Sequence, residues 1–250
     1  MRSWLAALSL VALRAFGADP TVIYLAGDST MAEKSAEARP ETGWGEKLSK
    51  FFDSSAVRVD NRAMNGRSTR SFIAEGRWTS IVRSLHAGDY VFIQFGHNDS
   101  KIDKKELYAS PDDYGRNLAN FVSQVRSRQA TPVLLTPVMR RRFDEKGELH
   151  DSHGAYPDVV RKLAAAQSVP LIDMHRDSAR ILREYGAEGS KKLFLILPPG
   201  AHPHYRKGIE DNTHFSPLGA EEMAAIAVDA IRELLPDLAA HLKEKPVPRP

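Results

Sequence analysis

Short apolar runs alternate with amphipathic segments along the chain, and this alternation predicts a parallel sheet flanked by helices. Residues 21–26 are almost continuously apolar, as expected of a strand that is covered on both faces. Further strands are expected at 57–63, 90–95, 133–136 and 169–173. This order predicts an α/β fold, an open three-layer α/β/α sandwich that binds its ligand at the carboxyl ends of the strands.

Helical periodicity fills the intervals between these strands. In 112–129, apolar residues recur at spacings of three and four, at Leu118, Phe121, Val122 and Val125. The clearest helix is expected at 216–235, where Ser216 is suited to the N-cap and Pro217 to the first turn. Shorter helices are expected at 46–52, 78–85, 157–167 and 178–185.

The first 18 residues have a different character. Arg2 precedes the apolar run 4–13, and small residues follow at 17–18, which is the pattern of a secretory signal. The alternative is a buried N-terminal helix, while the run is too short to span a bilayer comfortably. We expect a signal at 1–18, one domain at 19–240 and a proline-rich tail at 241–250. The protein is expected to be secreted or periplasmic, with no stable membrane association after signal removal.

Composition narrows the class of protein. A chain of 250 residues with 42% hydrophobic and 27% charged residues is typical of one soluble globular domain. The formal charge of +3 falls to +1 without residues 1–18, which contain two arginines and no acid. Nothing in this balance predicts a nucleic-acid partner. The absence of cysteine excludes disulfides, thiolate metal sites and a cysteine nucleophile. Oligomeric state is not determined by these features.

Candidate chemistry lies at opposite ends of the chain. Ser29 follows Gly27 directly after the first expected strand, and Asp211 and His214 precede the last expected helix. A hydroxyl, an imidazole and a carboxylate are the parts of a nucleophilic triad. A spacing of three residues fits one turn, so that Asp211 reaches Nδ1 of the imidazole while Nε2 faces the serine. Each motif alone has an ordinary structural interpretation, as a helix N-cap and a pre-helix loop.

Two further loops supply polar groups at strand ends. Gly66 follows the second expected strand, and glycine lets a backbone N–H approach a ligand closely. Asn98 follows the third strand, where its side-chain NH₂ is suited to meet a developing oxyanion. An Asn-Gly turn and a capped strand-to-helix turn are the alternatives. Four loops at strand ends carry serine, glycine, asparagine and the Asp/His pair in this order along the chain. This combination is hard to explain by chance and favours an enzyme that transfers acyl groups.

The blocks Gly-Asp-Ser-Thr, Asn-Gly-Arg, Gly-x-Asn-Asp and Asp-x-x-His resemble those of the SGNH (GDSL) hydrolase superfamily, across residues 20–235. The resemblance implies a flavodoxin-like domain with a central five-stranded parallel sheet and no cofactor. It implies Ser29 as nucleophile, His214 as general base and then acid, and Asp211 as the orienting carboxylate. The oxyanion hole would comprise the N–H groups of Ser29 and Gly66 and the side chain of Asn98.

A narrower resemblance, to rhamnogalacturonan acetylesterases, is carried by 61–78, 95–99 and 211–216. It implies a serine esterase that removes acetyl groups from an acetylated pectic polysaccharide or oligosaccharide. Other esterases on this fold remain alternatives, such as a xylan acetylesterase or a lysophospholipase. So does a non-catalytic carbohydrate-binding relative. A nucleotide-binding protein is disfavoured because the first loop has no glycine-rich phosphate motif.

Substrate contacts are expected from Arg67, Arg140 and His202. The planar fork of arginine suits a sugar carboxylate, although Arg67 and Arg140 are equally suited to tying down neighbouring loops. His202 and His204 flank Pro203 without acidic partners at metal-site spacing. We therefore expect no metal there.

Overall fold

The central sheet contains five parallel strands in the order β2-β1-β3-β4-β5. A computed structural model describes residues 20–244 of the chain. The strands are β1 (Thr21–Gly27), β2 (Val57–Asn61), β3 (Tyr90–Gln94), β4 (Thr131–Leu135) and β5 (Leu171–Ile172). The predicted fold class is confirmed. The last strand is shorter than expected because Asp173 already caps the following helix.

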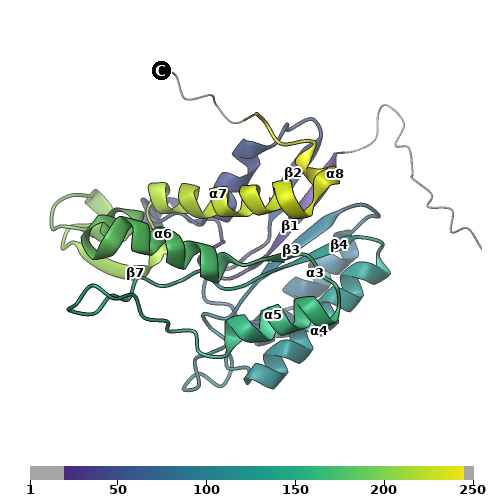
Figure 1. Cartoon of the computed structure of the whole chain (residues 1–250), viewed down its shortest axis with the longest axis horizontal. Coiled ribbons are helices and arrows are strands. Elements are labelled where there is room, and N and C mark those ends of the chain that lie inside the picture. The colour runs from purple at the N-terminus through teal and green to yellow at the C-terminus, as the bar shows by residue number, and fades with distance from the viewer. Residues whose placement is uncertain (1–19, 245–250) are drawn as a thin grey trace, which may run out of the picture.

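Helices cover both faces of this sheet (Figure 1). One layer comprises α1 (Gly45–Leu48), α6 (Met174–Gly189), α7 (Pro217–Leu234) and α8 (Pro236–Ala239). The other comprises α2 (Thr69–Ala74), α3 (Arg77–Ser84), α4 (Pro111–Ser127) and α5 (Tyr156–Ala166). Side chains of β1 alternate between the two cores, since Ile23 and Leu25 join the first and Tyr24 and Ala26 the second.

Local signals for the long helices are confirmed. The Ser216 hydroxyl accepts a hydrogen bond from the Gly219 N–H, and Pro217 opens α7. The expected helix at 46–52 is instead α1 followed by a 3₁₀ turn, Ser49–Phe51. The expected 178–185 helix is part of the longer α6, which kinks at Gly186. The short helix α2 was not predicted, since six residues are too few to show a period.

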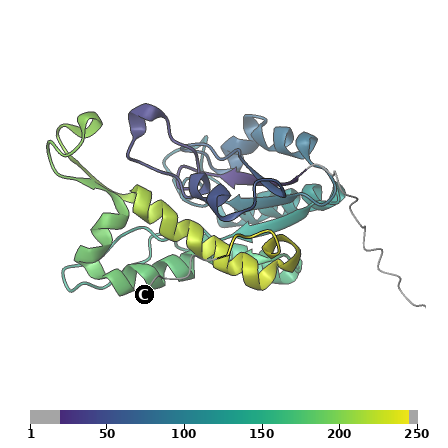
Figure 2. The same ribbon diagram turned by 90° about the horizontal axis from the view of Figure 1, so that it is seen from above.

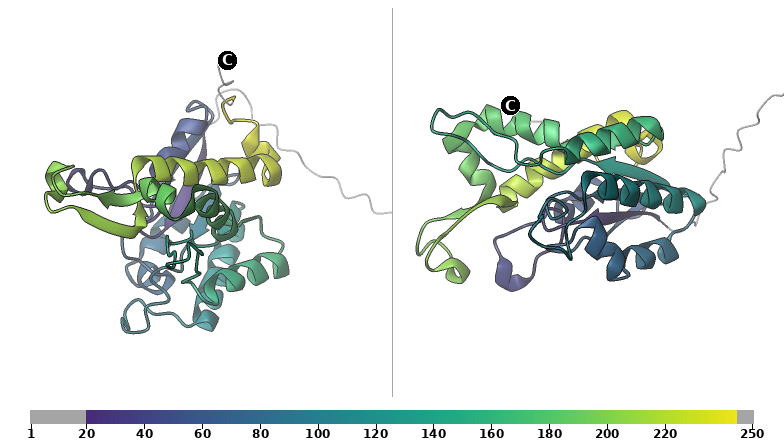
Figure 3. Two further views of the ribbon diagram at one scale, coloured as in Figure 1. Left: turned by 60° about the vertical axis from the view of Figure 1, so that its left-hand side comes forward. Right: turned by 90° about the horizontal axis from the view of Figure 1, so that it is seen from below.

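A second, two-stranded antiparallel sheet was also missed. It pairs β6 (Phe194–Leu197) with β7 (Ile209–Phe215). The 3₁₀ turn Ser190–Leu193 precedes β6, and the 3₁₀ turn Pro203–Tyr205 lies at the hairpin tip. Asp211 and His214 precede α7 as expected, but they lie in β7 and not in a loop. In Figures 2 and 3 the hairpin tip projects on the same side as the 3₁₀ turn Ala36–Ala38. The Tyr205 hydroxyl donates to the Ala38 carbonyl and so connects the hairpin tip to this turn.

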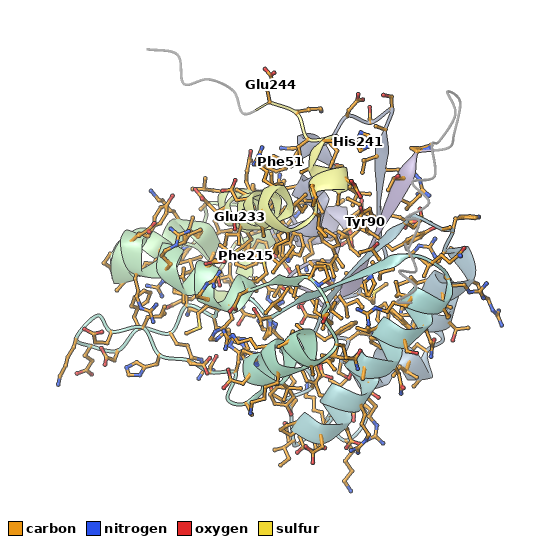
Figure 4. All side chains as sticks on the ribbon, turned by 45° about the vertical axis from the view of Figure 1, so that its right-hand side comes forward. Phe51, Tyr90, Phe215, Glu233, His241 and Glu244 are labelled. Atoms are coloured by element: carbon orange, nitrogen blue, oxygen red, sulfur yellow. The ribbon has the colours of Figure 1, made fainter. Side chains whose placement is uncertain are left out.

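The C-terminal segment packs against the body of the domain beyond residue 240. The Asp53 N–H donates to the His241 carbonyl, and the Lys243 N–H donates to the Phe51 carbonyl. Figure 4 labels Phe51 and His241 at this end of the molecule. The expected signal at 1–18 and the end of the tail, 245–250, lie outside the described residues. Within 20–244, no helix has the length and apolar character needed to cross a membrane.

Candidate active site

Ser29 lies at the point where the sheet order reverses, just after β1. Gly27 is required there, because a Cβ at this position would lie 2.8 Å from the Gln94 carbonyl oxygen of neighbouring β3. The turn is then held by Asp28, whose Oδ1 accepts hydrogen bonds from the Thr30 N–H and hydroxyl. Parallel α/β sheets place their ligand sites at such a switch point.

His214 bridges Ser29 and Asp211, although Ser29 and His214 are 185 residues apart in sequence. Its Nε2 lies 2.8 Å from Ser29 Oγ, and its Nδ1 lies 2.7 Å from Asp211 Oδ2. The other carboxylate oxygen of Asp211 accepts the backbone N–H groups of Thr213 and His214. The start of α7 and the antiparallel pairing of β6 with β7 hold this segment in place.

Electrostatics determines the tautomer of this histidine. Burial would raise the pKa of Asp211, but hydrogen bonds from the side chain and backbone of His214 outweigh burial and hold this pKa at about 2. An ionised carboxylate only accepts, so Nδ1 must carry the imidazole proton. Nε2 then has a free lone pair directed at the Ser29 hydroxyl. This is the arrangement in which an imidazole can remove the hydroxyl proton.

Three groups on the wall of the same cavity each keep an N–H that has no acceptor among residues 20–244. Within residues 20–244, the backbone N–H groups of Ser29 and Gly66 have no hydrogen-bond acceptor. Gly66 adopts a φ of 75°, which favours glycine. The Asn98 side chain donates one N–H to the Arg67 carbonyl at 3.0 Å and retains a second. Ser29, Gly66 and Asn98 all line one cavity of about 550 Å³. Such donors can stabilise an anionic oxygen.

A buried hydrogen bond between a carboxylate and an imidazole supports the two loops that carry Ser29 and Asn98. Asp28 Oδ2 lies 3.1 Å from Nδ1 of His97, and both side chains are almost completely buried. Burial would raise the pKa of Asp28, but His97 and Thr30 hold it at about 2. Burial lowers the pKa of His97, against the attraction of Asp28. The pair therefore joins a carboxylate to a neutral imidazole that donates from Nδ1.

Lys34 supports the loop that carries Ser29. Its ammonium donates to the Ser29 carbonyl and, at 2.8 Å, to Oδ1 of Asn65, and it pairs with Glu41 at 2.8 Å. Only 1% of the Lys34 side chain is exposed. One cation thus links the loops after β1 and β2, on which Ser29 and Gly66 lie.

The cavity wall includes one of the three expected substrate contacts. Arg140 lines it, and its guanidinium donates to the hydroxyl and carbonyl of Ser152 and to the His97 carbonyl. The Arg67 guanidinium instead pairs with Glu75 at 3.0 Å. His202 lies at the hairpin tip, where its ring accepts from the His204 N–H. Neither Arg67 nor His202 lines the cavity. Arg67 is held by Glu75 and His202 by the His204 N–H, and the sequence alone does not indicate these contacts.

Other residues of the wall went unnoticed in the sequence. They are Glu41, Ser100, Lys101 and Thr213. Glu41, Ser100 and Lys101 lie on loops, and Thr213 lies in the polar strand β7, so no period or capping motif marks them. Arg142, the last of three consecutive arginines after the fourth expected strand, also lines the wall. Arg140 and Arg142 alternate along an extended loop after β4, a spacing that could have suggested a shared face. A larger groove of about 680 Å³ lies between α6 and α7, and Ser29 and His214 are not among its lining residues.

One side-chain group has the composition of a metal site. The ligand atoms of Asp151, His153 and His175 lie within 4.8 Å of one another. Asp151 Oδ1 lies 3.2 Å from His153 Nδ1 and 2.9 Å from His175 Nε2, so hydrogen bonds already account for these atoms. Burial lowers the pKa of His153 to about 3. We therefore interpret the group as a structural connection between the 151–153 loop and α6.

The chain is similar to esterases of Bacillus subtilis, two of which are named as rhamnogalacturonan acetylesterases, one of them as probable. It is 42% identical to rhamnogalacturonan acetylesterase RhgT of Bacillus subtilis over 89% of this chain and 94% of the relative. It is 35% identical to YesY of the same organism, described as a probable rhamnogalacturonan acetylesterase, over 89% of this chain and 98% of that one. The crystal structure of YxiM from Bacillus subtilis superposes with a TM-score of 0.73 at 26% identity, covering 86% of this chain and 57% of that one.

The family can be assigned from the sequence as a whole. A sequence model of the GDSL-like lipase/acylhydrolase family matches residues 25–221, a span that contains every block discussed above. The five-stranded sheet and the serine at its switch point agree with this match. The chain therefore belongs to the GDSL-like lipase/acylhydrolase family of carboxylic ester hydrolases.

Proposed function

We propose that this enzyme removes O-acetyl groups from rhamnogalacturonan, with Ser29 as nucleophile, His214 as base and then acid, and Asp211 as the orienting carboxylate. The proposal is carried by one observation: Nε2 of His214 lies 2.8 Å from Ser29 Oγ at the wall of the cavity. The identity of 42% to RhgT supports the substrate.

In the first half of the reaction, His214 Nε2 accepts the Ser29 proton as Oγ bonds to the acetyl carbon. The carbonyl oxygen becomes negative and meets the N–H groups of Ser29, Gly66 and Asn98. When the tetrahedral intermediate collapses, the bond to the sugar oxygen breaks, and that oxygen leaves with the proton from Nε2. Acetyl-Ser29 remains.

In the second half, a water molecule attacks the acetyl carbon while His214 accepts its proton. Collapse breaks the bond between the acetyl carbon and Ser29 Oγ, which regains the proton from Nε2. Acetic acid leaves and ionises to acetate in solution. Asp211 stays ionised throughout, consistent with its pKa of about 2. Each oxyanion donor is expected to contribute a factor of about 10²–10³ in rate.

The charge of the cavity wall favours an acidic polysaccharide. Lys101, Arg140 and Arg142 line it, whereas Glu41, the acidic residue among the lining residues, pairs with Lys34. Arg140 is partly engaged by Ser152 and His97, but among residues 20–244 the Arg142 guanidinium has no side-chain partner. A planar guanidinium matches a carboxylate such as that of galacturonate. We therefore assign carboxylate contact to Arg142 and Arg140 rather than to Arg67 or His202.

We further propose that residues 1–18 are a secretory signal, that the exported protein acts on substrate outside the cytoplasm, and that 19–240 form its single catalytic domain. The basic start and apolar core of 1–18 support this. Mass spectrometry of the exported protein tests it, with a mature chain that starts near Asp19 as the expected result. An intact N-terminus on exported protein would contradict it.

The decisive experiment measures acetate release from acetylated rhamnogalacturonan and acetylated xylan, and fatty-acid release from a lysophospholipid. We expect the pectic substrate to be fastest and Ser29→Ala to lower its rate by a factor of about 10⁴ or more. Ser35→Ala, an exposed serine six residues away, is the matched control. Equal rates for Ser29→Ala and the parent would refute the mechanism, and preference for xylan or lipid would refute the substrate.

A further inference from the structure

Lys101 lies on the cavity wall three residues after Asn98. Its ammonium lies 2.7 Å from Asn98 Oδ1. Within residues 20–244 this is the only hydrogen bond of the ammonium, and no carboxylate lies within ion-pair distance of it. The charge of Lys101 is therefore directed at one side-chain carbonyl.

The two hydrogen bonds of the Asn98 side chain determine which way its carboxamide oxygen and nitrogen point. An ammonium can only donate and a backbone carbonyl can only accept, so Oδ1 must face Lys101 and Nδ2 must face the Arg67 carbonyl. The nitrogen keeps one further hydrogen, and Asn98 lines the cavity with Ser29 and Gly66. Asn98 as a whole is only 3% exposed, so water does not compete freely for these positions.

The ammonium also changes the strength of this donor. An ammonium that donates to a carboxamide oxygen draws electron density from the amide nitrogen, because hydrogen bonds in a chain polarise one another. The free N–H then becomes a better donor to an anionic oxygen. This gain is larger for the transition state than for the neutral ester, since charge appears on the carbonyl oxygen only as the reaction proceeds.

We propose that Lys101 is a positioning residue of the oxyanion hole, whose ammonium orients and polarises the Asn98 carboxamide toward the developing oxyanion. This inference rests on the proposed function, because it requires Asn98 to act as an oxyanion donor. Lys101 need not touch the substrate.

The test compares Lys101→Met, Lys101→Gln and Lys101→Arg in hydrolysis of 4-nitrophenyl acetate, a neutral ester that tests the chemistry without the polysaccharide. We expect Lys101→Met and Lys101→Gln to lower kcat about tenfold, the loss of one charge-assisted contact, with KM changed less than about twofold. Lys101→Arg should restore most of the loss. Lys104→Met removes a nearby exposed cation from the same loop and should leave kcat unchanged.

A double-mutant cycle separates this role from a general electrostatic or structural one. In the Asn98→Ala background, Lys101→Met should cause no further loss of kcat, since its partner is gone. A full tenfold loss in that background, or wild-type kcat in both Lys101→Met and Lys101→Gln, would overturn the proposal. Circular dichroism and thermal melting confirm that each variant is folded. Wild-type protein without esterase activity would instead refute the proposed function itself.

Discussion

Replacing Asp211 by asparagine should move the imidazole proton of His214 from Nδ1 to Nε2 while leaving the shape of the site intact. Oδ1 of Asp211 accepts two backbone N–H groups, from Thr213 at 2.8 Å and from His214 at 2.9 Å. In Asp211→Asn this position must keep the oxygen, so the new NH₂ faces Nδ1 of His214, where the carboxylate oxygen now lies at 2.7 Å. Two donors cannot face each other. The imidazole proton therefore moves to Nε2.

The consequence for rate is large because Nε2 is the atom that faces Ser29. A protonated Nε2 of a neutral imidazole donates to Ser29 Oγ and cannot accept its proton. Loss of the correct tautomer in a serine triad lowers kcat by about 10⁴, which corresponds to about 5 kcal/mol of transition-state stabilisation. The binding cavity is unaltered, so KM should change little.

The assay is steady-state hydrolysis of 4-nitrophenyl acetate near neutral pH, with thermal melting to confirm folding. Glu210→Gln is the matched control, because it makes the same chemical change at the preceding, exposed position of β7. It should leave kcat at the wild-type level. An Asp211→Asn variant that keeps more than about a tenth of wild-type kcat would refute the tautomer argument.

Three further predictions concern stability. Burial raises the pKa of Asp99 to about 7; repulsion from Asp28 adds to this effect, and hydrogen bonds from Thr69 oppose it. The protonated Asp99 carboxyl therefore stabilises the folded state fully below its ordinary pKa near 4, and this stabilisation is lost as pH rises through 7. The wild-type Tm should therefore fall between about pH 5 and pH 8 more than that of Asp99→Asn, and equal slopes would contradict this. Gly43→Ala should destabilise the protein by about 3 kcal/mol in urea unfolding, because the new Cβ would lie 2.0 Å from the Ala32 carbonyl oxygen in the loop after Ser29. An unchanged urea midpoint would exclude that clash. Lys34→Met leaves Glu41 and Asn65 without their buried cation and should cost about 3 kcal/mol by the same assay, whereas exposed Lys105→Met should cost nothing measurable.

The sequence alone was sufficient for the elements whose signals are local. The strands β1 and β3 follow from continuous apolar runs, and α4 and α7 follow from period and capping, since these depend on residues within one or two turns. The order of the four polar blocks was also sufficient to predict the acyl-transfer chemistry, because parallel strands bring their carboxyl ends to one edge.

Tertiary structure decided the parts that depend on distant partners. The β6–β7 hairpin exists only because two segments pair across a loop, and β7 is too polar to show a strand period of its own. Arg67 binds Glu75 rather than the cavity, and Lys101 binds Asn98, because a long charged side chain takes whichever partner the folded loops bring within reach. Composition and spacing indicate which chemical groups are available. Only the folded chain determines which of them meet, since those contacts join residues that are far apart in sequence.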